Sequence, residues 1–168
     1  SRADFQRRMA ELDHFRAMHG ARDGMRRATF NGKHVVPGVT ALGEAKLWRT
    51  NWLQKQRFYS TFHLSPQTMQ LYLDDLNSFK PQIIDGFTSC IVDICNFAKN
   101  TGQPFGFKAT AVFPTSEPLY PHQRKLIQEM RGAPPRDQYA SSEGAPFIVE
   151  CVEGSLHALL HTGVIETT

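Results

Sequence analysis

From residue 57 onward, short apolar runs alternate with longer stretches in which apolar residues recur at helical spacing. We predict strands at the runs RFYSTF (57–62), QII (82–84), ATAVF (109–113) and DQYA (137–140). Ser65 and Pro66 favour a helix start, Ile91 lies in a second helical stretch, and a third runs from Pro121 to a stop at Gly132. Strands and helices that alternate with short connections predict an α/β fold: a parallel sheet with helices on both faces.

The two ends of the chain follow other patterns. Residues 1–56 are expected to hold an N-terminal helix, which stops near Gly20, and an irregular basic segment with short strand candidates at ATF (28–30) and HVV (34–36). Residues 57–144 form the predicted α/β subdomain. FIVEC, LHALL and GVIE, within residues 145–168, predict the strands of a second small β-sheet that adjoins it.

Length and composition fit one soluble globular domain. The chain has 168 residues, of which 40% are hydrophobic and 21% charged. No apolar run approaches the roughly 20 residues of a membrane span, and the first residues lack the apolar centre of a signal peptide. Three cysteines without a CxxC motif argue against a disulfide framework and for a reducing compartment, so we expect a cytoplasmic protein without a membrane partner.

The net charge of +3 hides an asymmetry. Residues 1–57 carry 12 Lys and Arg against 5 Asp and Glu, a net of +7, whereas the remaining residues carry 7 against 11, a net of −4. A basic half indicates either a polyanionic ligand or a solvated face with a few ion pairs. No aromatic-interleaved platform or recognition helix accompanies it, so we expect no nucleic-acid partner.

Two late loops place hydroxyl groups beside a carboxylate. PTSEP (114–118) and ASSEG (140–144) follow predicted strands, and ligands bind at the carboxyl ends of strands in this architecture. Ser141 and Ser142 could bind a phosphate, Glu143 a Mg²⁺ ion, and Tyr139 could offer its ring to a base. The alternative is structural: a turn at 142–143, and Ser116 as a helix N-cap.

A second group of residues could form part of a zinc site. Cys151, His157 and His161 lie within eleven residues, and Glu150 or a distant residue would supply a fourth ligand. The alternative is a buried thiol beside partly exposed imidazoles. The sequence contains no GxxxxGK[ST], GxGxxG or GxSxG motif, which disfavours a P-loop NTPase, a dinucleotide oxidoreductase and an α/β-hydrolase.

Four segments, in this order, resemble one family. They are WRTNWLQKQRFYSTFHLS, KPQIIDGFTSCIVDICNFAKNTG, KATAVFPTSEPL and DQYASSEGAPFIVECVEGSLH. Together they resemble the middle of phenylacetate–CoA ligase-like proteins, in the branch of capsular-polysaccharide biosynthesis proteins and deazaflavin-coenzyme adenylylating synthetases. That branch lies within the AMP-forming adenylating superfamily. The resemblance covers most of the chain, most specifically residues 48–65 and 80–161.

The resemblance implies an adenylate-forming ligase that uses ATP and Mg²⁺, with CoA as the acceptor. YASSE stands where the superfamily has Tyr-Gly-x-Thr/Ser-Glu, so Tyr139 would pack on adenine, Ser142 would touch the α-phosphate and Glu143 would hold magnesium. The catalytic assignments are Ser142 and Glu143. Ala140 replaces the usual glycine.

The resemblance also implies roles for two further segments and for a metal site. TSEP matches the loop along the adenine, which makes nucleotide contacts of Ser116, Glu117 and Pro118. DGFTS matches a segment that lines the carboxylate pocket, which brings in Gly86 and Phe87. Cys151 and His157 stand where some relatives hold a metal, so the resemblance also implies a zinc site.

The sequence also departs from the family pattern. It has no TSGTTG-like phosphate loop, no TGD motif and no catalytic lysine domain. We therefore expect an internal piece of a larger enzyme, inactive alone, whose partners are ATP, a small carboxylate and the other parts of that enzyme. Such a piece would expose apolar surface and could self-associate. The alternative is a stand-alone, non-catalytic module that binds a nucleotide or a protein.

Overall fold

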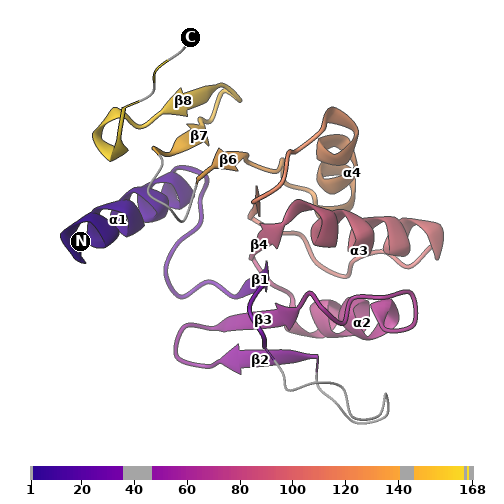
Figure 1. The fold of residues 1–168 in the computed structure, drawn as a ribbon. Helices are drawn as coiled ribbons and strands as arrows, with labels where there is room; N and C mark the ends of the chain where they lie inside the picture. Colours follow the sequence, from indigo (N-terminus) through magenta and orange to yellow (C-terminus); the bar gives the residue numbers. More distant parts are fainter. Residues whose placement is uncertain (1, 36–46, 141–145, 165, 167–168) are drawn as a thin grey trace.

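Parallel strands form the centre of the molecule. The computed structural model describes residues 2–35, 47–140, 146–164 and 166. Five strands form the main sheet in the order β2-β3-β1-β4-β5 (Figure 1). They are β1 (Arg27–Asn31), β2 (Trp48–Asn51), β3 (Gln56–Ser60), β4 (Ile83–Phe87) and β5 (Ala111–Thr115). All neighbours pair parallel except β2 and β3, which form an antiparallel hairpin at one edge.

Three helices cover one face of this sheet: α2 (Met69–Phe79), α3 (Thr88–Asn100) and α4 (Pro121–Arg131) (Figure 1). Their apolar sides meet the sheet in one core; the members include Tyr72, Leu76, Ile91, Ile94 and Ile127 from the helices, and Phe30, Tyr59, Ile84 and Val112 from the strands. The helices are amphipathic, so burying these sides removes their apolar stripes from water.

The other face carries α1 (Arg2–Met18) and a small antiparallel sheet, β6 (Gln138–Tyr139), β7 (Ile148–Glu150) and β8 (Leu156–Ala158), followed by the 3₁₀ turn η1 (Leu160–Thr162). A second core joins α1 to both sheets. It includes Phe15 from α1, Ile83 and Phe113 from the main sheet, and Phe147 and Val149 from the small one. Both faces of the parallel sheet are therefore covered, as the sequence predicted.

Several predictions about the helices are confirmed. Ile91, Ile94, Cys95 and Ala98 are buried on one side of α3. Helix α4 starts at Pro121, where proline costs no hydrogen bond. It ends at Arg131, and the next residue, Gly132, has a φ of 75°, the left-handed conformation that glycine adopts easily. No helix in the described ranges is long and apolar enough to cross a membrane.

Other expectations were wrong in detail. Helix α2 begins at Met69 rather than after Ser65, because residues 65–68 form a separate turn in which the Thr68 hydroxyl accepts a hydrogen bond from the Ser65 N–H (3.0 Å). The strand candidate ATF is confirmed within β1, but β1 is the middle strand of the main sheet, which the sequence did not predict. His34 and Val35 are not in a strand. Gln138–Tyr139 pairs with β7, so it belongs to the small sheet and not to the parallel one.

Candidate functional site

Two segments far apart in the sequence form a cleft at the carboxyl end of β5. The loop that follows β5 supplies Ser116, Glu117 and Pro118, and the small sheet supplies Asp137, Gln138 and Tyr139. Ala140, Ile148 and Leu156 complete the lining of a cleft of about 470 Å³. The structure thus brings together four of the predicted nucleotide-binding residues: Ser116, Glu117, Pro118 and Tyr139.

The loop after β5 is held in an unusual conformation. Ser116 has a φ of 67°, a left-handed value that costs a non-glycine residue about 1 kcal/mol or more. The Glu117 carboxylate accepts hydrogen bonds from the backbone N–H of Ser89 (2.6 Å) and from its hydroxyl (2.9 Å). Glu117 therefore ties the loop to the amino end of α3, where a negative charge also meets the helix dipole.

Tyr139 stands at the mouth of the cleft with 62% of its surface exposed. Its backbone pairs with Ile148 of β7, which leaves the ring free to face a ligand. A phenol ring that is held by its backbone and open to solvent can stack on a planar base.

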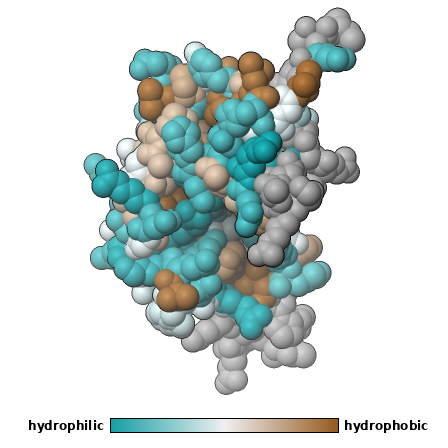
Figure 2. Space-filling model, turned by 90° about the vertical axis from the view of Figure 1, so that its left-hand side faces the viewer, coloured by the Kyte–Doolittle hydropathy of each residue, from teal (hydrophilic) through white to brown (hydrophobic). Residues whose placement is uncertain are grey.

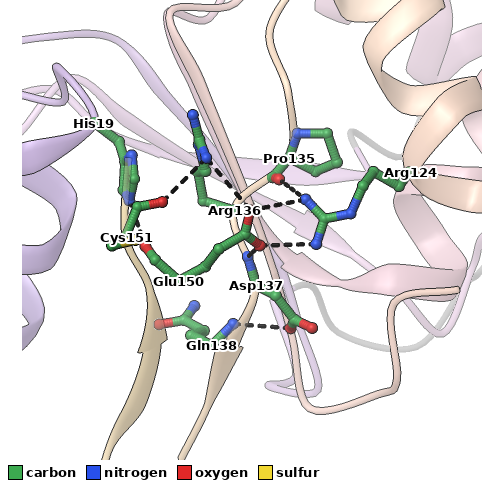
Figure 3. Close-up of polar contacts among 8 residues, drawn as sticks. All are labelled: His19, Arg124, Pro135, Arg136, Asp137, Gln138, Glu150 and Cys151. Atoms are coloured by element: carbon green, nitrogen blue, oxygen red, sulfur yellow. Dashed lines mark hydrogen bonds and ion pairs between the residues drawn. The ribbon is translucent and has the colours of Figure 1, made fainter. Parts of the chain in front are cut away.

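Glu150 joins the small sheet to α4 (Figure 3). It is 2% exposed, and its carboxylate accepts hydrogen bonds from Arg124 Nη1 (3.0 Å) and Nη2 (2.7 Å), from Arg136 Nη1 (3.3 Å) and from the Asp137 N–H (2.9 Å). The Glu150 carbonyl oxygen accepts a hydrogen bond from His19 Nε2 (2.8 Å). Glu150 thereby fixes the backbone that leads into Tyr139.

Burial and charge act in opposite directions on the carboxylates here. Burial raises the pKa of Glu150, but the hydrogen bonds from Arg124 and the Asp137 N–H, together with the Arg124 and Arg136 charges, bring that pKa below its ordinary value. Burial raises the pKa of Asp137, which lines the cleft, above its ordinary value. Glu150 is therefore firmly ionised, whereas Asp137 is the more easily protonated carboxyl.

Gly86 and Phe87, predicted to line a substrate pocket, lie at the end of β4, beside β1. Gly86 has a φ of 132°, and a Cβ on it would lie 1.9 Å from the carbonyl oxygen of Phe30. The close approach of β1 and β4 therefore requires glycine at this position. The Phe87 ring lies beside Gly32, where an added Cβ would come within 3.2 Å of it.

Three of the remaining predicted site residues, Ser141, Ser142 and Glu143, lie outside the described ranges. The predicted zinc ligands are described. Cys151 is half-buried, His157 is exposed in β8, and His161 Nε2 lies 2.7 Å from the Glu11 carboxylate. Among the described residues, no group of three or more His, Cys, Asp or Glu could hold a metal ion.

Sequence reasoning missed Arg124, Arg136 and Asp137, and it considered Glu150 only as a zinc ligand. Arg124 lies 26 residues from Glu150, and Arg136 lies 14 residues away. No local motif links residues at such separations. A charged residue inside the apolar run FIVEC was the available signal, since a buried charge needs a partner.

Comparison with known proteins agrees with this fold. No protein-family model matches the sequence. Protein CapK of Staphylococcus aureus is 36% identical over 163 residues, which are 97% of this chain and 36% of CapK.

Among solved structures, 2-hydroxyisobutyryl-CoA ligase in complex with 2-HIB-AMP and CoA is similar. In the thioesterification state its TM-score is 0.54 at 18% identity, with 87% of this chain and 33% of the ligase covered. The open conformation gives a TM-score of 0.52 at 18% identity, with 82% and 32% covered. The chain has the fold of part of a CoA ligase. It spans about a third of the length of these relatives.

Proposed function

We propose that this chain is the adenine- and magnesium-binding part of an AMP-forming, ATP-dependent carboxylate ligase of the phenylacetate–CoA ligase-like branch. The cleft carries the proposal, because the β5 loop and Tyr139 line it together. The likeness to a CoA ligase in fold and to CapK in sequence supports the adenylating superfamily.

The proposed roles follow the cleft. Tyr139 packs on the adenine, and the loop 116–118 lies along its edge. Glu117 acts through its carboxylate, which holds the loop against Ser89. Ser142 contacts the α-phosphate, and Glu143 is the magnesium ligand. When bound, Mg²⁺ would stabilise negative charge on the phosphates.

The proposed reaction has two steps. An oxygen of the substrate carboxylate attacks the α-phosphorus of ATP, and the bond to pyrophosphate breaks, which leaves an acyl-adenylate. A thiol, that of CoA, then attacks the acyl carbon and releases AMP. Gly86 and Phe87 would lie near the carboxylate. Residues beyond those of this chain would hold the β- and γ-phosphates, so we expect no turnover by the chain alone. Zinc at Cys151 and His157 has no third ligand in the described residues to support it.

A calorimetric titration of the chain with ATP and Mg²⁺ tests the nucleotide site. We expect weak, saturable binding that Tyr139→Ala and Glu143→Ala each reduce about tenfold, since a lost stacking or metal contact is worth roughly 1–3 kcal/mol. Phe5→Ala is the matched control, because Phe5 is 62% exposed on α1, away from the cleft.

Two results would contradict the proposal. One is a folded chain that binds no ATP. The other is ATP binding that Tyr139→Ala leaves unchanged. Binding without turnover, even when the flanking parts of the longer protein are supplied, would favour a non-catalytic nucleotide-binding module instead.

A further inference from the structure

A second cleft lies at the opposite edge of the main sheet, at the amino ends of β1 and β4. We call it the basic cleft. It encloses about 710 Å³, and its lining includes Arg26, Trp52, Lys55, Arg57, Phe79 and Lys80. Arg26 directly precedes β1, Lys80 follows α2, and Trp52 and Lys55 lie in the turn between β2 and β3. Its volume is within the range of small-molecule sites.

Positive charge in the basic cleft is not balanced. None of its described lining residues is acidic. Arg57 is neutralised by Asp75, whose two carboxylate oxygens lie 2.7 and 2.8 Å from Arg57 Nη1. Toward the described residues, the Arg26 side chain donates only through its Nε, to the Lys80 carbonyl oxygen (3.0 Å). In the described part of the chain, no carboxylate forms an ion pair with Arg26, Lys55 or Lys80.

Both lysines occupy backbone conformations that suit glycine. Lys55 has a φ of 49° and Lys80 a φ of 50°; of the described non-glycine residues, only Ser116 also has a positive φ. Each lysine costs about 1 kcal/mol in this region relative to a relaxed residue. Glycine would relieve this strain at either position. Both positions instead hold a lysine, and both lysines line the basic cleft.

Trp52 adds a flat apolar surface to the rim. Its side chain is 80% exposed, which is unusual for a ring of this size. An exposed indole beside cationic groups provides a face for ring stacking next to side chains that can bind an anion.

We propose that the basic cleft binds a small ligand that carries at least two phosphate groups and a planar ring. Arg26, Lys55 and Lys80 bind the phosphates, and the ring stacks on Trp52. The site is separate from the candidate adenylate cleft, because the two lie at opposite ends of the parallel strands, so both can be filled at once.

Trp52 fluorescence tests this proposal. The chain has two tryptophans, so Trp48→Phe leaves Trp52 as the one reporter. We expect ADP, in EDTA, to quench Trp52 saturably, and the quenching to weaken as salt is added. Inorganic pyrophosphate should compete with ADP. Calorimetry with ADP on the chain that retains Trp48 provides a second readout.

Lys55→Gly combined with Lys80→Gly is the decisive variant. It removes two charges while relieving backbone strain, so the thermal midpoint should not fall, yet ADP affinity should drop about tenfold or more. Lys99→Ala combined with Lys125→Ala is the matched control, with the same loss of charge on α3 and α4. Tyr139→Ala should leave the quenching of Trp52 intact, which separates this site from the adenylate cleft.

Three results would overturn the proposal: quenching that the glycine variant leaves unchanged, quenching that Tyr139→Ala abolishes, or an acidic peptide that binds more tightly than ADP. The last result would assign the basic cleft to a protein partner.

Discussion

At the residue scale, Arg131 is a cation enclosed in the apolar core. It is 1% exposed, and its guanidinium carbon lies 3.9 Å from the ring centre of Phe105 and 4.1 Å from that of Phe107. None of the described residues accepts a hydrogen bond from Nε, Nη1 or Nη2. Burial lowers the pKa of Arg131 to about 10, so it remains charged at neutral pH. The two ring contacts therefore offset only part of the cost of removing this charge from water.

We predict that Arg131→Met is at least as stable as the parent chain. Methionine fills a similar volume and brings no unpaired donor, and replacing a buried ion with an apolar side chain is often neutral or stabilising by about 1–4 kcal/mol. Arg131→Ala should lose about 2 kcal/mol or more, because it leaves a cavity. Urea unfolding of both variants measures this. A large loss in Arg131→Met would show that the cation–ring contacts outweigh the unpaired donors.

His19 predicts a pH dependence. Burial lowers the pKa of His19 below its ordinary 6.5, and the Arg136 charge lowers this pKa further. The hydrogen bond to the Glu150 carbonyl oxygen and the Glu150 charge raise the pKa, but they do not cancel the effect of burial. The unfolded chain therefore takes up a proton before the folded chain does. Stability from this residue is present above about pH 6.5 and falls as the pH drops from there towards the folded pKa.

His19→Gln isolates this effect, because the amide still donates a hydrogen bond but does not titrate. We expect the thermal midpoint of the parent chain to fall relative to this variant between about pH 6.5 and 5. Parallel curves over that range would contradict the assignment.

At the scale of elements, the contact between β1 and β4 depends on Gly86. We predict that Gly86→Ala loses at least about 3 kcal/mol, because a Cβ only 1.9 Å from the Phe30 carbonyl oxygen prevents the two strands from pairing. Gly24→Ala is the control. Its φ of 81° is also left-handed, but no atom of the described residues lies within 4 Å of an added Cβ, so it should cost only about 1–2 kcal/mol. Equal losses would show that strain alone, rather than the close approach, sets the requirement.

Glu150 joins three elements, so its removal should loosen β6 and β7 from α4. We predict that Glu150→Gln loses about 3 kcal/mol at pH 7, because it leaves Arg124 and Arg136 without their buried partner. The pKa of Glu150 is lowered in the folded chain, so this stability is present above about pH 4.5 and is lost as the pH falls through the folded pKa.

Denaturant unfolding at pH 7 and at pH 3 tests this, and the difference from the parent should shrink at pH 3. Glu129→Gln is the control. It removes an exposed carboxylate 3.9 and 4.0 Å from two lysines and should cost less than about 0.5 kcal/mol. A Glu150→Gln variant that matched it would show that the buried ion pairs contribute little.

At the scale of the whole molecule, apolar side chains are exposed on the small sheet and its continuation. Val152, Leu156, Leu160 and Val164 are 55–82% exposed. Figure 2 shows apolar patches at the upper end of the molecule, which is the level of the small sheet in Figure 1. Apolar surface gathered in this way indicates contact with another chain or another segment.

We predict concentration-dependent self-association through this surface. Leu156→Ser combined with Leu160→Ser should shift the chain towards monomer, as measured by sedimentation velocity. Leu53→Ser combined with Leu71→Ser removes exposed leucines elsewhere and should leave association unchanged. A monomeric parent chain at high concentration, or equal effects of both pairs, would contradict this prediction.

The sequence by itself determined the helices α3 and α4, the mainly parallel sheet and the loop that follows β5. Their signals are local: Pro121 at a helix start, Gly132 at its end, and apolar residues at helical spacing in α3. These signals depend on φ, ψ and side-chain direction within a few residues, so they can be recognised without knowing which distant segments the residues will contact.

Only the tertiary structure decided which strand is central, where Gln138–Tyr139 belongs and what Glu150 does. Strand β1 is five residues long and buried between β3 and β4, so it shows no alternation of polar and apolar residues. The partners of Glu150 lie 13, 14 and 26 residues away. Hydrogen bonds between distant segments form when the chain folds back on itself, and they leave no period in the sequence.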